Sequence, residues 1–291
     1  METKSQSHVA AEGLAIYDSY MKSPYLSIKH TSYFHVYEKL LSPLRGKPVT
    51  LVEIGVLNGG SLFMWRDFLG PLARIIGVEF NPDAERWKAH GFEIFIGDQS
   101  DPTFWSSILP SIGEIDVCID DGGHSNLQQI VTTALVTPCI KDGGMLIVED
   151  THTSFMRQFG NPSRYSFVSY AKDIADAIHS RFPSVRASKN PLAEYVSSVC
   201  FMESMVVFNV NRQECFVSEP TENNGTTIEA RDFRYHGTVQ RLLGDTRERL
   251  YRKFKGINEQ SILRRLATFL FSTILFLQHR ITPKKEKKYF G

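Results

Sequence analysis

Short apolar runs alternate with stretches of helical spacing through the middle of the chain. From about Pro48, each run is followed by a turn signal and then by a helical pattern, and the runs cover 49–55, 73–80, 92–98, 114–121 and 143–150. They are nearly continuous in valine, isoleucine and leucine, which is typical of parallel strands covered on both faces. This alternation predicts right-handed crossovers and a doubly wound, Rossmann-like α/β sheet.

The pattern changes on both sides of these runs. Residues 166–182 have helical spacing, and the runs 195–203 and 204–210 predict an antiparallel hairpin that closes the sheet. Residues 9–45 are helical in pattern and rich in tyrosine, which indicates either a packed layer or a lid over the ligand cleft. We therefore expect a helical lid at 1–46, an α/β domain at 47–215 and a C-terminal extension at 216–291 with a basic amphipathic helix.

Composition is that of a globular protein. The chain has 291 residues, of which 42% are hydrophobic and 12% aromatic, and a net charge of +1, so it can bury a sizeable core. Its four cysteines form no C-x-x-C pair, which predicts a reducing compartment with neither a disulfide framework nor a zinc site. The first residues lack the apolar core of a secretory signal, so we expect a cytoplasmic protein.

Acidic residues close several of the apolar runs. In an open α/β sheet the ligand crevice lies beyond the carboxyl ends of the strands, so these acids should face it. A single acid at a strand end is more often a helix cap, but capping poorly explains adjacent pairs on two strands. The acids are Glu79, Asp98, Asp120, Asp121, Glu149 and Asp150, and a histidine, His124, follows the fourth of them.

The first run ends in a glycine-rich turn, EIGVLNGGS, at 53–61. A dinucleotide fingerprint would need glycine where Leu57 stands, and the turn lacks the Lys-Ser/Thr pair of a phosphate-binding loop. A nucleoside ligand with a ribose and an amino-acid end, but without phosphates, fits this turn better. Glu79 is placed to accept hydrogen bonds from ribose hydroxyls, and Asp98 lies one strand further, near the expected adenine.

Five motifs occur in order across roughly residues 29–160: EIGVxxGGSLxMW, GVExNP, GDQSD, IDDGGH and VEDTHTS. With them the chain resembles the class I S-adenosylmethionine-dependent methyltransferases. More narrowly, it is similar to the metal-dependent sugar O-methyltransferases of macrolide biosynthesis and to the related cephalosporin hydroxylase-like group.

The resemblance implies roles for individual residues. It places the metal ligands on Asp121, Glu149 and Asp150, and the general base on His124. Gly55, Gly59 and Glu79 match cofactor positions of the family, with Glu79 standing where aspartate is commoner. The full set of expected cofactor-binding residues is Glu53, Gly55, Gly59, Ser61, Glu79, Asp98 and Asp120.

Elementary chemistry agrees with a metal site. Three carboxylates at adjacent strand ends should not stay ionised together without a cation. Oxygen ligands favour a hard divalent ion, above all Mg²⁺. Such an ion would lower the pKa of a sugar hydroxyl, and His124 would remove its proton as the oxygen attacks the methyl group of S-adenosylmethionine.

Other residues carry weaker expectations. His152 could assist the base or touch substrate, or it could be an ordinary surface histidine. The candidates for the lid are Lys29, His30 and Tyr33, and those for the acceptor pocket are Arg157, Arg164 and Tyr165.

The C-terminal region is basic. Residues 241–291 hold 13 Lys and Arg against 4 Asp and Glu, and 241–265 are helical in pattern. The apolar stretch 266–277 lies between basic flanks and is shorter than the ~20 residues that span a bilayer. The segment 262–288 therefore predicts a helix that lies in a membrane interface or packs on protein. Nucleic acid is not expected, because the charge is local and no RNA-binding signature accompanies it.

These features together predict a Mg²⁺- and S-adenosylmethionine-dependent O-methyltransferase. Its acceptor would be a sugar hydroxyl of a surface polysaccharide, a lipid-linked glycan or a glycosylated metabolite. We expect the protein in the cytoplasm or at the inner membrane surface, and a homo-oligomer is compatible with the sequence. Two alternatives are a non-catalytic nucleoside-binding scaffold and a metal-dependent hydroxylase. The hydroxylase is disfavoured because a redox iron site would need two histidines with one carboxylate, and only His124 stands among the acids.

Overall fold

A computed structural model describes most of the chain. The described residues are 11–159, 164–183, 185–226, 228, 242, 245–246, 249–250, 252–254, 261–281 and 287–289. The chain divides into two compact units, Met1–Pro220 and Thr221–Gly291, and each is considered by itself. About half of the helical stretch predicted at 241–265, and residues 282–286 of the basic tail, lie outside the described residues.

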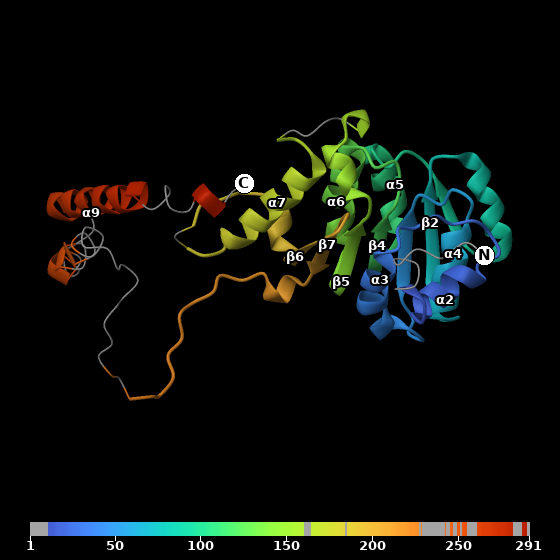
Figure 1. The fold of residues 1–291 in the computed structure, drawn as a ribbon, viewed down its shortest axis with the longest axis horizontal. Helices are drawn as coiled ribbons and strands as arrows, with labels where there is room; N and C mark the ends of the chain where they lie inside the picture. Colours follow the sequence, from blue (N-terminus) through green and yellow to red (C-terminus); the bar gives the residue numbers. More distant parts are fainter. Residues whose placement is uncertain are drawn as a thin grey trace. The chain divides into compact units, whose positions relative to one another are not determined.

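The first unit is built on one seven-stranded sheet with the order β3-β2-β1-β4-β5-β7-β6 (Figure 1). Strands β1 to β5 are parallel, whereas β7 runs antiparallel to both β5 and β6. The predicted doubly wound sheet with an antiparallel strand near its end is confirmed. The strands are β1 (Thr50–Ile54), β2 (Arg74–Glu79), β3 (Glu93–Ile96), β4 (Ile115–Asp120), β5 (Ile140–Val148), β6 (Val196–Met202) and β7 (Met205–Val210).

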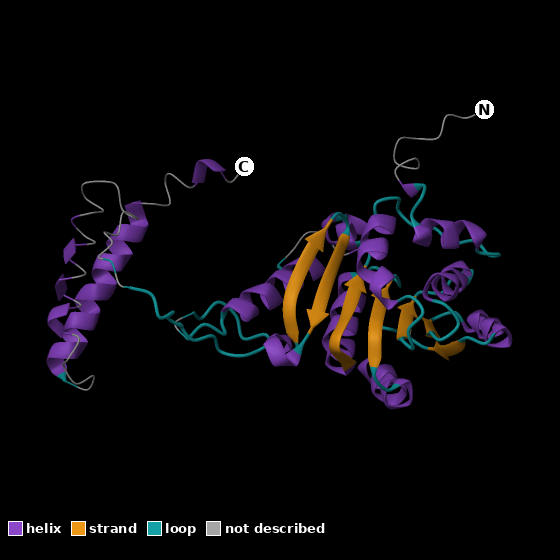
Figure 2. Ribbon diagram, turned by 90° about the horizontal axis from the view of Figure 1, so that it is seen from below, coloured by secondary structure: helices purple, strands orange, loops and turns teal. Residues whose placement is uncertain are grey.

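Helices cover both faces of the sheet (Figure 2). One face carries α2 (Ala15–Lys22), α3 (Tyr33–Leu41), α4 (Gly60–Leu69) and the 3₁₀ helix η2 (Pro82–His90). The other carries α5 (Pro102–Ile112), α6 (Asn126–Val136) and α7 (Phe167–His179). Short 3₁₀ turns join these elements: η1 (Ser42–Leu44), η3 (Thr137–Cys139), η4 (Thr151–Phe155), η5 (Arg157–Phe159), η6 (Pro191–Glu194) and η7 (Arg212–Glu214).

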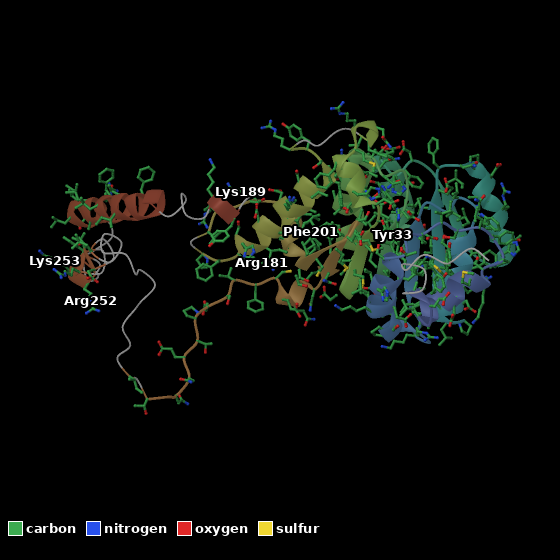
Figure 3. The ribbon with its side chains drawn as sticks, viewed as in Figure 1. Tyr33, Arg181, Lys189, Phe201, Arg252 and Lys253 are labelled. Atoms are coloured by element: carbon green, nitrogen blue, oxygen red, sulfur yellow. The ribbon has the colours of Figure 1, made fainter. Side chains whose placement is uncertain are left out.

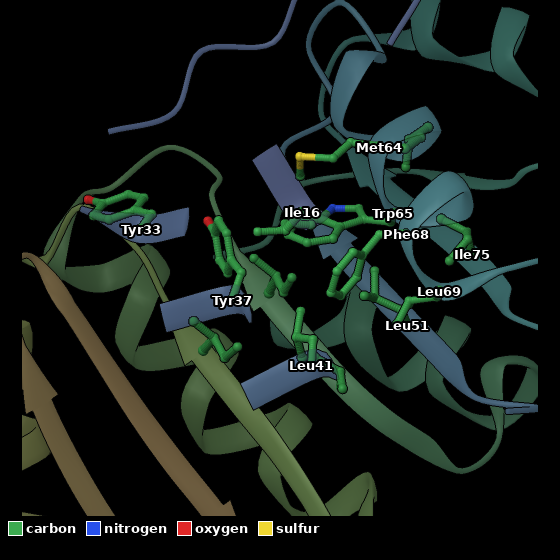
Figure 4. Packing of buried hydrophobic residues seen from close by; sticks show 14 of the residues in the cluster. Ile16, Tyr33, Tyr37, Leu41, Leu51, Met64, Trp65, Phe68, Leu69 and Ile75 are labelled. Carbon is green, nitrogen blue, oxygen red and sulfur yellow. The ribbon is translucent and has the colours of Figure 1, made fainter. Parts of the chain in front are cut away.

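The N-terminal helical region is part of the core. In α3, Tyr33, Phe34, Tyr37 and Leu41 are almost completely buried, and each apolar side chain of this size stabilises a fold by roughly 1.5–3 kcal/mol when buried. In Figure 4, Tyr37 lies beside Trp65 of α4, and Tyr33 lies farther out at the edge of the cluster. The part of the region that reaches the ligand cleft is instead the extended segment 23–32 between α2 and α3.

Strand alternation decides on which side of the sheet each acid lies, because successive side chains point to opposite faces. Glu53, Asp121 and Glu149 each come two residues after a core residue of the layer formed by α3 and α4. Asp120 comes two residues after Cys118, which belongs to the opposite layer. Three acids from three neighbouring strands are therefore directed toward α3 and α4.

The predicted hairpin is confirmed, and its second strand is the one that pairs with β5. The turn lies at Glu203 and Ser204, and Ser204 has a φ of 59°. The carbonyl of Ser204 accepts a 3.0 Å hydrogen bond from the Thr151 amide. This arrangement brings the turn to the carboxyl end of β5, where Glu149 and Asp150 stand.

The second unit contains α9 (Ile262–Ile281) and the 3₁₀ turn η8 (Lys287–Tyr289). Its basic character is visible in the exposed side chains of Arg252 and Lys253 (Figure 3). Within the part of the chain that the structure describes, no helix is both long enough and apolar enough to cross a membrane.

Candidate active site

A cavity of about 500 Å³ lies at the carboxyl ends of β1 to β4. The end of each strand contributes to its wall, and residues 26–28 of the extended segment contribute as well. The predicted site residues that line it are Gly55, Ser61, Glu79, Asp98, Asp121, His124 and Asp150. Four predicted site residues do not belong to the lining that the described residues form: Glu53, Gly59, Asp120 and Glu149.

The glycine-rich turn between β1 and α4 needs its glycines. Gly55 has a φ of 88°, and a Cβ at this position would lie 2.0 Å from the carbonyl oxygen of Asp121. Gly59 has a φ of 77°, and a Cβ there would lie 2.4 Å from the ring of Trp87. Positive φ is costly for other residues, and here the added carbon would also clash. The bare backbone therefore forms one wall of the cavity and leads directly into the first turn of α4.

Glu79 holds this turn in place. Its Oε2 accepts hydrogen bonds from the amides of Val56 (2.8 Å) and Leu57 (2.9 Å), while its Oε1 accepts from Phe80 (2.8 Å) and Asn81 (3.0 Å). The carboxylate thus ties the end of β2 to the end of β1. Sequence reasoning expected a ribose contact at Glu79 and did not foresee this structural role.

Gln99 connects the parts of the site that follow β3 and β4. It belongs to the GDQSD motif, but it was not among the site residues predicted from the sequence. Its Nε2 donates a 2.9 Å hydrogen bond to Asp120 Oδ1, and its Oε1 accepts one of 2.9 Å from the amide of Gly123. Burial raises the pKa of Asp120. Asp98, at the cavity wall, accepts hydrogen bonds from both the amide and the hydroxyl of Ser100.

A lysine stands where the sequence analysis expected a cation among the acids. The ammonium of Lys29 lies 2.6 Å from Asp121 Oδ2 and 3.0 Å from both oxygens of Glu149. It is also 3.8 Å from Glu53, and only 1% of its side chain is exposed. Burial alone would lower the pKa of Lys29, but the three carboxylates raise it above its ordinary value. The ammonium therefore stays charged and neutralises part of the acid cluster.

Glu149 and Glu53 are bound to the α3 and α4 layer. Glu149 is completely buried and also accepts a short hydrogen bond from the Tyr37 hydroxyl. Burial and the neighbouring Asp121 raise the pKa of Glu149. Glu53 accepts hydrogen bonds from Ser61 Oγ (2.7 Å) and Trp65 Nε1 (2.9 Å), and burial raises the pKa of Glu53 to about 7 although Lys29 opposes the shift. Both acids anchor helices instead of facing the cavity.

Asp150 and His124 face one another at the cavity wall. The distance between His124 Nε2 and Asp150 Oδ2 is 3.4 Å. Both residues have positive φ, 56° for His124 and 54° for Asp150, which is uncommon for residues other than glycine and clusters at functional sites. Asp150 is held by Tyr33, whose hydroxyl donates to its Oδ1 and accepts from its amide.

Metal ligands could come from two groups among the described residues. The donor atoms of Asp121, His124 and Asp150 lie within 4.8 Å of one another, and so do those of His30, Asp150 and His152. Carboxylates and imidazoles of this kind fit a divalent cation whose other positions are filled by water or substrate. The first group differs from the expected Asp121, Glu149 and Asp150, because the oxygens of Glu149 are turned to Lys29.

The second group corrects one expectation. His124 is not the only histidine among the acids, since His30 Nε2 lies 3.7 Å and His152 Nδ1 lies 4.0 Å from Asp150 Oδ1. Residues 30 and 150 are far apart in sequence, and they come together only because α3 packs on the sheet. The sequence pattern therefore does not indicate this grouping. His152 also contacts Ser204 of the hairpin turn. The cavity lining formed by the described residues contains none of the acceptor-pocket candidates Arg157, Arg164 and Tyr165.

Comparisons with known proteins give two kinds of similarity. The chain is 33% identical over 167 residues to the 8-demethyl-8-alpha-L-rhamnosyl tetracenomycin-C 2'-O-methyltransferase of Streptomyces olivaceus. This alignment covers 53% of this chain and 43% of that enzyme. The chain is also 33% identical over 165 residues to the mycinamicin VI 2''-O-methyltransferase of Micromonospora griseorubida, covering 51% and 40%. The chain thus spans less than half the length of these relatives. No protein-family model matches it.

The fold is shared with a solved methyltransferase. The MycE methyltransferase from the mycinamycin pathway, in complex with Mg and SAH, aligns with a TM-score of 0.60 and 23% identity over 69% of this chain and 55% of that one. The sequence resemblance and the structural similarity agree. The chain has the class I methyltransferase fold, and in sequence it is a relative of the sugar O-methyltransferases of macrolide and polyketide pathways.

Proposed function

We propose that the protein is an S-adenosylmethionine-dependent O-methyltransferase that methylates a sugar hydroxyl. The observation that carries this proposal is the cavity whose wall runs from the bare glycine turn at Gly55 to the facing pair His124 and Asp150. Named relatives methylate sugar hydroxyls of glycosylated metabolites, and the MycE structures hold Mg and SAH.

The cofactor would lie along the ends of β1, β2 and β3. Its amino-acid end would contact the turn from Gly55 to Ser61, its ribose hydroxyls would reach Glu79, and its adenine would lie beside Asp98 and Gln99. The cavity lining includes Gly55, Ser61, Glu79, Asp98 and Gln99. The methyl group would then point toward Asp121, His124 and Asp150 at the other wall.

A divalent cation, Mg²⁺ or another hard ion, would be held by Asp121 and Asp150. When bound, the ion would lower the pKa of the sugar hydroxyl and fix its orientation. His124 Nε2 lies 3.4 Å from Asp150 and 4.0 Å from Asp121, so it is within reach of a hydroxyl placed between those carboxylates.

His124 would act as the general base. Its Nε2 would accept the hydroxyl proton as the sugar oxygen attacks the methyl carbon. One oxygen–carbon bond forms, the carbon–sulfur bond of the sulfonium breaks, and the electron pair stays on sulfur as a neutral thioether. Asp150 would stabilise the imidazolium that results, since the two side chains face one another.

Calorimetric titration with S-adenosylmethionine, with and without Mg²⁺, tests this proposal. We expect saturable binding of one cofactor per chain, and transfer of a labelled methyl group to rhamnosyl glycosides supplied as probes. Absence of cofactor binding under both conditions would rule out the proposed function and leave a scaffold as the better interpretation.

A finer proposal concerns where the acceptor resides. Exposed apolar side chains recur along α9 with a spacing that gathers them on one broad side of the helix: Ile262, Leu263, Leu266, Phe269, Leu270 and Phe276. Together with the basic flanks, this face supports contact with anionic lipid and hence a lipid-linked glycan as acceptor. Co-sedimentation with vesicles containing anionic lipid tests this: a variant lacking 262–288 should no longer sediment, and equal sedimentation of both proteins would leave packing on protein as the role of α9.

One observation favours a second candidate function. His30, His152 and Asp150 provide the two histidines and one carboxylate that non-haem iron oxygenases use. Oxygen consumption that depends on Fe²⁺ and is lost in the His30→Ala variant would support a hydroxylase. Methyl transfer that is unaffected by iron would instead favour the methyltransferase.

A further inference from the structure

Lys29 is enclosed within the acid cluster, and only 1% of its side chain is exposed. Its ammonium has carboxylate oxygens of Asp121, Glu149 and Glu53 within 4 Å, at 2.6, 3.0 and 3.8 Å. The ring centroids of Tyr37 and Trp65 each lie 5.9 Å away. A cation is thus surrounded on several sides by groups that stabilise positive charge.

We propose that Lys29 is a permanent counter-ion of the inner acids and that it keeps Glu149 out of the metal site. Of the three carboxylates expected to bind the divalent ion, only Asp121 and Asp150 would then hold it, at the cavity wall. The presence of the ion in this inference rests on the proposed function. The role of Lys29 as a counter-ion does not depend on it.

The contacts of Glu149 support this assignment. Both of its oxygens are 3.0 Å from Lys29, and Oε1 also accepts from Tyr37. Only 1% of the Glu149 side chain is exposed, compared with 20% for Asp121 and 20% for Asp150. An ion that enters from the cavity therefore meets Asp121 and Asp150, whereas Glu149 is sealed behind them.

Asp121 links the two cation positions. Its Oδ2 is bound to Lys29, while its Oδ1 faces His124 at 4.0 Å. Because Lys29 belongs to the segment that also contributes residues 26–28 to the cavity wall, its ion pairs anchor this segment against β4 and β5. The charge of the ammonium should therefore keep the cluster folded without metal, and it should lower the affinity of the remaining site for a divalent ion.

Mn²⁺ binding, followed by electron paramagnetic resonance on the full chain without acceptor, tests the ligand set. Outer-shell partners of a metal site typically contribute about 10- to 100-fold in affinity, so loss of a ligand itself should weaken binding by about a hundredfold or more, and we expect this for Asp121→Asn and Asp150→Asn. Glu149→Gln removes a carboxylate that is not a ligand and should weaken binding by about tenfold or less. The proposal is overturned if Glu149→Gln weakens binding as much as Asp150→Asn does while the circular dichroism spectrum is unchanged.

Lys29→Met supplies an independent test through thermal stability. With EDTA its melting temperature should fall below that of the wild type, because the three acids lose their counter-ion. Mn²⁺ should then raise the melting temperature of Lys29→Met more than that of the wild type, since the ion can enter between Asp121 and Glu149. The matched control is Lys39→Met, which removes an exposed lysine of α3 and should respond to Mn²⁺ as the wild type does.

The two proposals fail in different ways. If the wild type binds S-adenosylmethionine but no Mn²⁺, while Lys29→Met gains a Mn²⁺-induced shift, the lysine replaces the metal and the metal part of the proposed function is wrong. If Lys29→Met gains no shift beyond that of the wild type, Lys29 is not the counter-ion, whatever the activity of the enzyme.

Discussion

The hydroxyl of Tyr33 donates a 2.5 Å hydrogen bond to Oδ1 of Asp150. Four residues later on the same helix, Tyr37 donates to Glu149, the residue that precedes Asp150. Residues at i and i+4 lie on one face of a helix, so α3 presents two hydroxyls to two consecutive acids. The helix that was expected to be a lid is thereby a support for the candidate site.

We expect Tyr33→Phe to lower the rate of methyl transfer while leaving the affinity for S-adenosylmethionine unchanged. Asp150 would lose the donor that orients it toward His124, and the unfolding free energy should fall by about 1 kcal/mol because a partly exposed carboxylate loses one hydrogen bond. Turnover and cofactor titrations on the purified variant check both parts. Tyr17→Phe, on α2, is the control, since Tyr17 packs on Phe34 away from the acids. A Tyr33→Phe variant with unchanged turnover would show that Asp150 needs no such support.

Gly55→Ala should abolish cofactor binding. The new Cβ would lie 2.0 Å from the carbonyl oxygen of Asp121, so the turn and the end of β4 must move apart. Gly91→Ala is a close control: Gly91 has a φ of 81° but nothing within 4 Å of the added carbon. Both variants should lose roughly 1 kcal/mol of stability from the positive φ.

The comparison of these two glycine variants separates backbone strain from the clash. If Gly91→Ala and Gly55→Ala bind S-adenosylmethionine equally well, the wall formed by the β1 turn does not carry the cofactor. Calorimetry at matched protein concentration is sufficient to decide this.

The sheet and the neighbourhood of the acids could be predicted from the sequence. Apolar runs bounded by turn signals identify buried parallel strands, and the carboxyl ends of such strands meet at one edge. Thus Asp121 and Asp150 were expected together, and the structure places them together with His124.

The partners of the individual acids could not be predicted in the same way. Alternation implies that Glu149 and Asp150 point to opposite sides of β5, but only if the last residue of the strand is known, and patterns locate strand ends poorly. Lys29 and Asp121 are 92 residues apart in sequence. Their contact is therefore set by how α3 and the segment before it pack on the sheet, which no local pattern indicates. Sequence reasoning placed Lys29 in the lid for this reason and missed its contact with the acids.

His124→Ala should reduce methyl transfer by about a hundredfold or more, the range expected when a general base is removed. Affinities for S-adenosylmethionine and Mn²⁺ should hold, because the proposed ligands of the ion are Asp121 and Asp150. Single-turnover measurements with a labelled methyl donor check the chemical step. His179→Ala is the control, since His179 is an exposed residue at the end of α7 and does not line the cavity within the described residues.

Two other outcomes would change the interpretation of His124. Unchanged turnover in His124→Ala would remove it from the mechanism. A parallel loss of Mn²⁺ affinity would make it a metal ligand and would leave the base to another residue.

The ion pair between Arg74 of β2 and Glu93 of β3 should make stability depend on pH. Arg74 donates two hydrogen bonds of 2.6 Å to the carboxylate, and this interaction lowers the pKa of Glu93. A lowered pKa in the folded state means that the stabilisation is complete above the unfolded pKa of about 4.3 and is lost as the pH falls through the folded value. Because both side chains are partly exposed, we expect about 1 kcal/mol or less. Urea unfolding of wild type and Glu93→Gln should therefore differ at pH 7, and the difference should shrink as the pH falls below about 4.3. A difference that stays constant over this range would show that the carboxylate charge contributes nothing to the pairing of β2 with β3.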